Sequence, residues 1–446
     1  MKKILLISLL LITSISLYLL VLANKENIKT EEEKNSFPNE EKHNQISALI
    51  IKKAPTYLTL LFEDNTISNI NSLNDASLEI GNTIKITYDN ELDPLKEKQD
   101  IKIINYQKEE DNFFLKEDGF LSSYYNKAYQ KLKELSQKEK IGELFLLRYP
   151  DKLNKVNYVG GYVFYAKDFK NKSKSSIAKM ITSLQENRNI KLLTAVDEEG
   201  GTVTRLSHIA KFSSPQQLYK EGGFSKIEED TINKSKLLEE LGLNLNLAPV
   251  VDISTNKDDY IYKRTLGEDE VLTSKYAKTV IEASKNYNVS YTLKHFPGYG
   301  NNIDTHYNSS LDTRTYEELV NKDLLPFEEG IKSGAEAILV SHNIVSALTN
   351  EPASLSIIIH NLLRKNLNFK GIVITDDISM KAVSENNDST LKALLAGNNL
   401  IITSNYQESY SEISKALQDN IIPEEYLDYL VLRNLAWKYS KNLINE

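Results

Sequence analysis

Residues 289–300 read VSYTLKHFPGYG, and this stretch decides which fold the sequence predicts. Its first five residues form an apolar run of the kind found in a buried β-strand. A loop rich in glycine and proline follows, and it starts with the titratable side chains of Lys294 and His295. A strand that ends in such a loop is where we expect an active site, because rigid strands hold functional loops in position.

Two further titratable residues follow within a few positions. Asp304 and His306 are separated by one residue, so in an extended segment their side chains lie on one side and can hydrogen-bond. A carboxylate that orients a histidine tunes it as a general acid/base near neutral pH. Together with His295 this pair could instead hold a metal ion. No fourth ligand stands at a suitable spacing, so we expect neither a metal nor a cofactor.

Outward from this stretch, apolar runs alternate with charged helical segments. Eight such runs occur, at residues 144–147, 162–165, 191–196, 243–251, 289–293, 337–340, 371–374 and 400–403. Eight strands with helical crossovers predict an α/β fold, specifically a (β/α)8 TIM barrel. A doubly wound sheet is the main competitor, but its usual glycine-rich phosphate loop after the first strand is absent from this sequence.

Polar residues cluster where several of these runs end. The run ends carry Asp197-Glu198-Glu199-Gly200-Gly201, Asp252, Lys294-His295, Ser341-His342-Asn343 and Asp376-Asp377. In a TIM barrel the catalytic groups lie at the C-terminal ends of the strands. The sequence therefore predicts an active site at that end of the barrel.

The N-terminal part of the chain follows a different pattern. Residues 1–23 join a basic start to a long apolar stretch, which predicts either a cleaved signal peptide or a retained membrane anchor. Both interpretations predict an exported, extracellular or cell-surface protein, whose N-terminal segment contacts the membrane if it is retained. Residues 24–45 predict a disordered linker, because they are rich in Lys, Glu and Asn. Short alternating runs within residues 46–112 predict a small all-β domain of unknown role, followed by a barrel domain at 119–446.

Composition narrows the function classes. The formal net charge is −8 and no concentrated basic face is evident, which argues against a nucleic-acid partner. The chain has no cysteine, so disulfides, thiolate metal sites and a cysteine nucleophile are excluded.

The residues at the run ends resemble the β-N-acetylglucosaminidase branch of the family 3 glycoside hydrolases. That family's motif is Lys-His-(Phe/Ile)-Pro-Gly-(His/Asn)-Gly, then a short spacer and Asp-(Ser/Thr)-His. The likeness extends in order over roughly residues 138–405, and no comparable match covers residues 1–118. Its other segments are Asp197-Glu198-Glu199-Gly200-Gly201 with Arg205, Ala248-Pro249-Val250-Val251-Asp252, Asp323-Leu324-Leu325-Pro326-Phe327, Pro352-Ala353-Ser354-Leu355-Ser356 and Thr375-Asp376-Asp377-Ile378-Ser379-Met380.

The resemblance implies an exo-acting, retaining enzyme that removes terminal GlcNAc from peptidoglycan fragments or chito-oligosaccharides. It implies that Asp376 is the nucleophile, which forms a covalent glycosyl intermediate, and that His306 is the general acid/base with Asp304 as its carboxylate partner. The residues that it implies for gripping the terminal sugar are Asp197, Arg205, Arg264, Lys294 and His295.

The sequence also departs from the family pattern. Tyr299 stands where His or Asn is usual, Glu198 replaces a common Gln, and residues 264–267 read Arg-Thr-Leu-Gly in place of Arg-Ser-Phe-Gly. The spacer between Gly300 and Asp304 is three residues, one fewer than in the commoner pattern, which bears on the conformation of this loop.

Structural interpretations stand beside the functional ones. Asp376 and Asp197 could cap helices, Lys294 and His295 could form an ion-pair cluster with Asp304, and Asp252 and His342 could brace the barrel top or contact substrate. Two other functions also stay open: a β-glucosidase or β-xylosidase of the same family, and a catalytically inactive surface protein that binds glycans.

Overall fold

The computed structural model describes residues 43–73, 75–99, 101–109, 119–151, 158–300, 310–384 and 388–444. Eight parallel strands form a nearly closed barrel, and their order around it follows their order in the chain. The barrel strands are β6 (Phe145–Arg148), β7 (Gly161–Phe164), β8 (Leu193–Val196), β9 (Leu245–Asn246), β10 (Ser290–Phe296), β12 (Ala337–Val340), β14 (Ile372–Thr375) and β15 (Ile401–Thr403). A parallel bridge joins Ile374 of β14 to Leu400, the residue before β15. It brings together the two strands at the ends of the sheet, β14 and β15. Each strand overlaps one of the eight predicted runs, so the predicted barrel is confirmed.

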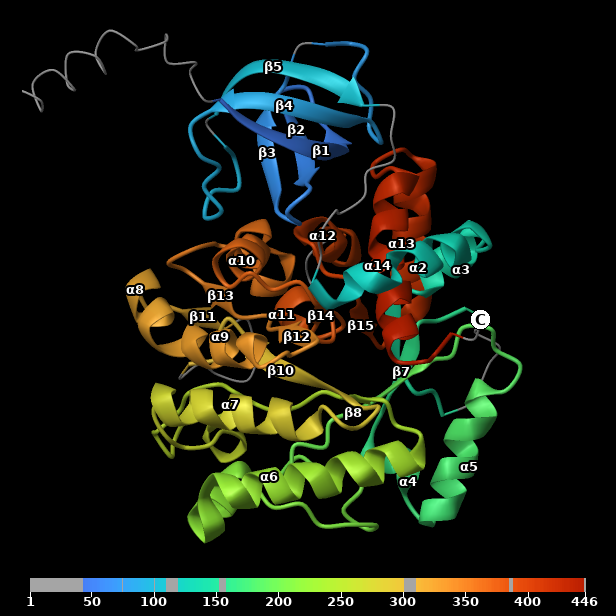
Figure 1. Cartoon of the computed structure of the whole chain (residues 1–446), viewed down its shortest axis with the longest axis vertical. Coiled ribbons are helices and arrows are strands. Elements are labelled where there is room, and N and C mark those ends of the chain that lie inside the picture. The colour runs from blue at the N-terminus through green and yellow to red at the C-terminus, as the bar shows by residue number, and fades with distance from the viewer. Residues whose placement is uncertain are drawn as a thin grey trace, which may run out of the picture.

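Helices between the strands cover the outside of the barrel (Figure 1). They are α4 (Ala166–Phe169), α5 (Lys174–Gln185), α6 (Pro215–Leu241), α7 (Glu270–Ser284), α8 (Tyr316–Glu318), α9 (Leu324–Lys332), α10 (Ile357–Asn361), α11 (Lys381–Ser384), α12 (Ser389–Ala396) and α13 (Tyr406–Gln418). Short 3-10 or π segments are η1 (Gly119–Tyr124), η2 (Tyr262–Arg264), η3 (Leu319–Asp323), η4 (Ala353–Leu355) and η5 (Leu362–Asn366), and β11 (Leu311–Asp312) pairs with β13 (Ile344–Val345).

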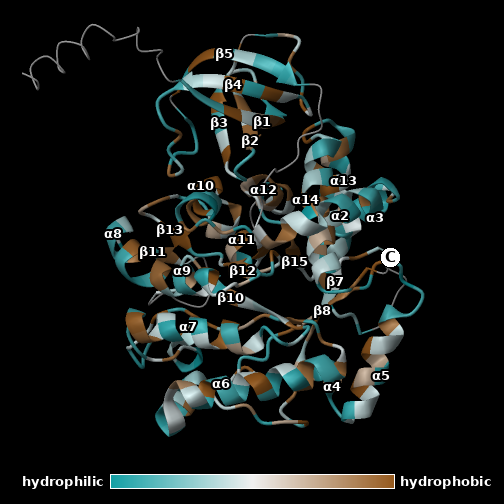
Figure 2. Ribbon diagram, in the orientation of Figure 1, coloured by the Kyte–Doolittle hydropathy of each residue, from teal (hydrophilic) through white to brown (hydrophobic). Residues whose placement is uncertain are grey.

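The barrel strands read as unbroken apolar runs because both of their faces are covered. Every residue of β7, β8, β10, β12, β14 and β15 is buried, which is the pattern expected of a parallel sheet with helices outside and a packed core inside. Figure 2 shows hydrophilic and hydrophobic colours alternating along outer helices such as α7 and α9, as expected of helices with one face on the barrel and one in solvent.

An antiparallel sheet precedes the barrel, which confirms the predicted small all-β unit. Its strands lie in the order β3-β2-β1-β4-β5. They are β1 (Asn44–Lys53), β2 (Tyr57–Phe62), β3 (Ile67–Asn71), β4 (Thr83–Asp89) and β5 (Lys102–Glu109). The first strand begins at Asn44, two residues before the predicted start of this unit.

The two faces of this sheet pack differently. Leu49 and Ile51 of β1, with Leu61 and Ile67, belong to the same apolar cluster as the barrel core. The alternate residues, among them Ile50 of β1, form a separate cluster within the sheet's own unit. Since successive strand residues face opposite sides, one face of the sheet is packed onto the barrel (Figure 1).

A long C-terminal helix, α14 (Glu424–Ser440), closes the end of the barrel where the strands begin; α2 (Tyr125–Lys133) and α3 (Gln137–Gly142) lie beside it. Four of its side chains bond groups that stand just before a barrel strand. These pairs are Arg433 with the Gly371 carbonyl, Asn434 with the Asn399 carbonyl, Trp437 with Glu336, and Lys438 with Glu143, at 2.6–3.0 Å. The C-terminal ends of the strands are thus left as the open end.

No helix in the described ranges is both long and apolar enough to cross a lipid bilayer. The predicted signal or anchor segment, 1–23, and the predicted linker up to residue 42 lie outside the described residues.

A buried amide should hold the N-terminal sheet on the barrel. The Asn361 side chain accepts from the Ile67 backbone N–H at 2.9 Å and donates to the Ile67 carbonyl at 2.7 Å. Asn361→Ala leaves two buried backbone groups without partners, so we expect it to lower the free energy of unfolding by about 2–4 kcal/mol.

The matched control crosses the same interface at its surface. Lys365, with a 53% exposed side chain, pairs with Asp64 at 2.9 Å, and Lys365→Ala should cost less than about 1 kcal/mol. Urea unfolding of both variants provides the comparison. An Asn361→Ala effect no larger than that of Lys365→Ala would contradict this account of the interface.

Candidate active site

A polar pocket of about 380 Å³ opens at the C-terminal ends of the barrel strands. Its volume is at the small end of ligand cavities, roughly 300–1,000 Å³, so it suits a single small, polar ligand unit. The charged and aromatic residues that line it are Arg148, Tyr165, Asp197, Glu199, Arg205, Tyr260, Arg264, Lys294, His295, Tyr299, Asp376 and Asp377. It thus brings together every predicted site residue except Asp304 and His306, which lie outside the described residues.

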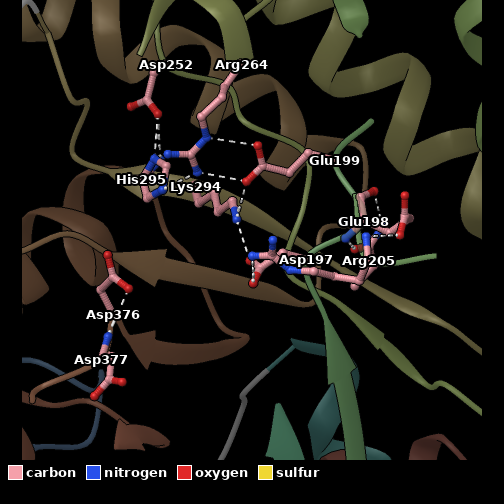
Figure 3. Close-up of polar contacts among 11 residues, drawn as sticks. Asp197, Glu198, Glu199, Arg205, Asp252, Arg264, Lys294, His295, Asp376 and Asp377 are labelled. Atoms are coloured by element: carbon pink, nitrogen blue, oxygen red, sulfur yellow. Dashed lines mark hydrogen bonds and ion pairs between the residues drawn. The ribbon is translucent and has the colours of Figure 1, made fainter. Parts of the chain in front are cut away.

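Lys294 is the centre of an ion-pair network on one wall of the pocket (Figure 3). Its side chain is 4% exposed, and its Nζ lies 2.9 Å from Asp197 Oδ1 and 2.7 Å from Glu199 Oε1. Burial would raise the pKa of both carboxyl groups, but the neighbouring cations hold the pKa of each below its usual value. Burial likewise opposes the charged ammonium, yet the two carboxylates raise the pKa of Lys294 overall. All three groups are therefore charged at neutral pH.

Two arginines extend this network. Arg264 makes a two-pronged bond to Glu199, with Nε to Oε2 at 2.9 Å and Nη2 to Oε1 at 2.8 Å. Its Nη2 also lies 3.3 Å from His295 Nε2, and Arg205 Nη2 donates to Asp197 Oδ2 at 3.2 Å. The result is a wall of fixed donors and acceptors, which suits binding of a ligand rich in hydroxyl groups.

Glu199 is the network member to which the sequence had assigned no role. It belongs to the quoted motif after β8, but its link to Lys294 and Arg264 spans 65 to 95 positions of the chain and becomes visible only in the fold. The sequence feature that could have identified Glu199 is its position two residues after Asp197, at the C-terminal end of a barrel strand.

The end of β10 explains why both Lys294 and His295 line the pocket. Neighbouring strand residues normally point to opposite faces. The register of β10 against β12 shifts between Leu293 and Phe296, and such irregularities re-aim side chains next to active sites.

A glycine pair lets the chain turn sharply after the carboxylates. Gly200 and Gly201 have φ of 97° and 63°, a region that residues with a Cβ rarely adopt. A Cβ on Gly200 would stand 2.3 Å from the Ser213 carbonyl oxygen. The next helix, α6, begins only at Pro215 and is capped by Ser214, so Asp197 does not cap it.

Asp252 and His342 brace the site from behind. Asp252 is buried and accepts from the His295 backbone N–H at 3.2 Å and the Tyr299 N–H at 2.7 Å, and its carboxylate lies 2.7 Å from His295 Nδ1. His342, also buried, lies 3.0 Å from the Asp377 carbonyl oxygen through Nε2. Neither residue lines the pocket, so the structure favours the bracing interpretation of both.

Asp376 follows β14 and lines the pocket apart from the Lys294 network, as Figure 3 shows. Its Oδ1 accepts from the Asp377 backbone N–H at 2.9 Å. The Asp377 carboxylate accepts from the Ser379 N–H and from the Ser404 hydroxyl. The next helix, α11, begins only at Lys381, so Asp376 is not a helix cap. It is a carboxylate that rigid scaffold presents to the cavity.

Sequence analysis missed two residues on the first strands of the barrel. Arg148 ends β6 and Tyr165 follows β7, and both line the pocket. The Arg148 guanidinium lies 4.7 Å from the Tyr165 ring centroid. The signal available was their position at strand ends, but neither belongs to a charged cluster in the sequence.

A parallel barrel with a charged pocket at the C-terminal ends of its strands defines the class of TIM-barrel enzymes. The model of the glycosyl hydrolase family 3 N-terminal domain matches residues 132–436. A β-hexosaminidase from Xylella fastidiosa (strain M23) is 33% identical over 234 residues, which cover 50% of this chain and 69% of that protein. The chain therefore belongs to glycosyl hydrolase family 3, and it is a glycoside hydrolase.

Solved structures give the same result. A family 3 β-N-acetylglucosaminidase from a Paenibacillus species superposes with a TM-score of 0.65 at 28% identity, covering 70% of this chain and 64% of that chain. A family 3 glycosyl hydrolase from Mycobacterium smegmatis superposes with a TM-score of 0.62 at 27% identity, covering 68% of this chain and 98% of that one. This chain thus spans less than two thirds of the Paenibacillus enzyme.

Glu198 follows Asp197 in the chain, does not line the pocket and is fully buried. Its Oε2 accepts from the backbone N–H groups of Arg205 and Leu206, at 2.8 and 2.9 Å, whereas its Oε1 has no hydrogen-bond partner. Burial raises the pKa of Glu198 above its usual value, although the backbone donors oppose this. The folded protein therefore holds this proton more tightly than the unfolded chain does, and stability falls as pH rises from the ordinary glutamate pKa through the raised one.

We expect Glu198→Gln to remove this pH dependence, because the amide has the same shape and no charge. The variant's unfolding temperature, relative to the parent protein, should rise between pH 5 and pH 8. Thermal unfolding at both pH values measures it, with Glu134→Gln as control because the Glu134 side chain is 62% exposed. If the difference in unfolding temperature between Glu198→Gln and the parent protein is the same at both pH values, burial does not raise the pKa of Glu198.

Proposed function

We propose that this protein is an exo-acting, retaining β-N-acetylglucosaminidase. The observation that carries the proposal is the placement of Asp376 in one small pocket with the Lys294 network (Figure 3). A carboxylate nucleophile needs the anomeric carbon of a sugar held in front of it. A wall of charged donors and acceptors can hold that sugar by its hydroxyl and N-acetyl groups. The sequence likeness to β-hexosaminidases supports the choice of an N-acetylated sugar.

Sugar binding is assigned to Asp197, Arg205, Arg264, Lys294 and His295. Ion pairs among the first four and with Glu199 keep those side chains in place before substrate arrives, and the Asp252 carboxylate holds His295. Preorganised groups lose little conformational freedom on binding, and they favour a transition state for which they are already oriented. The pocket volume of about 380 Å³ is at the small end of ligand cavities, which supports action on one terminal sugar.

The reaction proceeds by double displacement without metal or cofactor. An Asp376 oxygen attacks the anomeric carbon while the bond to the leaving oxygen breaks, and His306 gives that oxygen a proton. His306, oriented by Asp304, then takes a proton from water. The resulting oxygen attacks the anomeric carbon and releases Asp376 with overall retention of configuration.

The proposed setting is outside the cytoplasmic membrane. Residues 1–23 have the pattern of a signal peptide or anchor that contacts the membrane. The substrates would then be GlcNAc-containing peptidoglycan fragments or chito-oligosaccharides, with no nucleic acid involved.

A panel of nitrophenyl glycosides tests the proposed function. We expect the GlcNAc glycoside to be hydrolysed with a higher kcat/KM than the glucoside or xyloside. A preference for a sugar without the N-acetyl group would establish a β-glucosidase or β-xylosidase. Binding of GlcNAc oligomers without release of sugar would establish an inactive glycan-binding protein.

Asp376→Asn should abolish turnover while the protein stays folded, because the amide keeps the shape but is no nucleophile. We expect a loss in kcat of roughly a thousandfold or more. Asp377→Asn is the matched control, since it neutralises the adjacent carboxylate. A 2-fluoro glycoside should label the parent protein at Asp376, as mass spectrometry of peptides can show. Label on any other carboxylate would reject the assignment.

His306→Ala should slow natural oligosaccharides by on the order of 10²–10⁴-fold, the usual contribution of a general acid. Dinitrophenyl glycosides need little protonation of their leaving group, so their glycosylation step should lose far less. Single-turnover rates with both substrates make the comparison. Equal losses on the two would count against the acid role.

A further inference from the structure

Arg205 lines the pocket from a segment that is neither helix nor strand. Among the described residues its guanidinium has one hydrogen-bond partner, Asp197, at 3.2 Å, and its buried Nε has none. The Tyr165 ring, whose centroid lies 5.3 Å from Arg205 Cζ, adds a cation–π contact. An arginine side chain has many rotamers, and so few contacts select among them only weakly. The position of the guanidinium therefore depends on how firmly the Arg205 backbone is held.

Glu198 supplies the backbone contacts that this irregular segment would otherwise lack. Its Oε2 accepts from the N–H of Arg205 at 2.8 Å and from the N–H of Leu206 at 2.9 Å (Figure 3). In a helix or strand these donors would be paired with backbone carbonyls, whereas here one carboxylate oxygen serves both. Because two successive N–H groups converge on one oxygen, the place of that oxygen sets the orientation of the Arg205 backbone.

The barrel in turn fixes Glu198. Asn246 of β9 accepts from the Glu198 backbone N–H at 3.0 Å and donates to the Glu198 carbonyl at 3.2 Å. Glu198, Asn246 and Leu206 are all fully buried, and Leu206 belongs to the apolar cluster of the barrel core. A continuous set of buried contacts thus runs from a barrel strand through Glu198 to the backbone of a pocket residue.

We propose that Glu198 is a positioning residue, whose carboxyl group fixes the Arg205 backbone and thereby sets where the Arg205 guanidinium meets the terminal sugar. Glu198 does not line the pocket, so it acts only through Arg205. This inference rests on the proposed function and assigns a role to a residue that the proposed mechanism does not use.

Two substitutions at Glu198 separate the acceptor oxygen from the bulk of the side chain. Glu198→Met has a similar length but no oxygen, so we expect KM for the nitrophenyl GlcNAc glycoside to rise about tenfold, the value of one well-placed hydrogen bond to substrate. Glu198→Gln keeps an acceptor oxygen at the same place, and its KM should stay within about twofold of the parent value. A Glu198→Gln variant with the same rise in KM as Glu198→Met would overturn the inference.

A double-mutant cycle tests whether Glu198 acts through Arg205. Arg205→Ala alone should raise KM. Glu198→Met added to Arg205→Ala should raise KM little further, because no guanidinium is left to position. If the two increases in KM multiply in the double variant, the residues act independently and the inference is wrong.

Asn361→Met is the matched control. Asn361 also bonds two buried backbone groups through its side chain, those of Ile67, but it does not line the pocket. Both Met variants should lose stability, whereas only Glu198→Met should change KM. An equal rise in KM for Asn361→Met would assign the effect to general destabilisation and overturn the inference.

Amide hydrogen exchange reads the backbone directly. We expect the peptide that contains Arg205 and Leu206 to exchange faster in Glu198→Met than in the parent protein, and unchanged exchange would contradict the proposed contact. If Glu198→Met does not fold, Glu198→Asp replaces it. The Asp carboxylate is one methylene too short to reach both N–H groups, so KM should again rise, and a KM equal to that of the parent would overturn the inference.

Failure of the proposed function would look different. If the parent protein hydrolyses no aryl glycoside, or if Arg205→Ala leaves KM unchanged, the proposed enzyme or the proposed role of Arg205 fails. If Arg205→Ala raises KM and Glu198→Met does not, only the positioning role of Glu198 is wrong.

Discussion

A buried lysine ammonium needs carboxylates beside it, and in this barrel both come from the turn after β8. Lys294 lies between Asp197 and Glu199, because an uncompensated charge at that depth would cost several kcal/mol. The pairing ties the ends of β8 and β10 together across β9. It also aligns Arg264 through Glu199 and Arg205 through Asp197. The geometry of this wall of the pocket therefore follows from neutralising one cation.

The opposite end of the barrel supplies the rigidity that this wall requires. The α14 helix bonds groups just before four barrel strands, and the N-terminal sheet packs against the same region (Figure 1). Asn65 of that sheet accepts from Arg433 of α14 at 3.0 Å. The stabilising contacts of α14 and of the N-terminal sheet thus lie at the end of the barrel where the strands begin. The C-terminal ends of the strands can therefore carry polar residues that would be unfavourable in a core.

The residues that line the pocket differ in burial. Ion-paired, buried groups form one wall, and residues such as Arg148 and Tyr260 are exposed to solvent.

Sequence alone determined the barrel, because strands covered on both faces must be apolar throughout and β10 and β12 show this directly. It also determined that Asp197, Lys294 and Asp376 stand at strand ends, where a barrel places its chemistry. Only the tertiary structure showed the pairing of Glu199 with Arg264, the packing of the N-terminal sheet on the barrel, and the stacking of Arg148 on Tyr165. These contacts join residues from separate strands or domains, and their energies depend on burial and distance that no local pattern records.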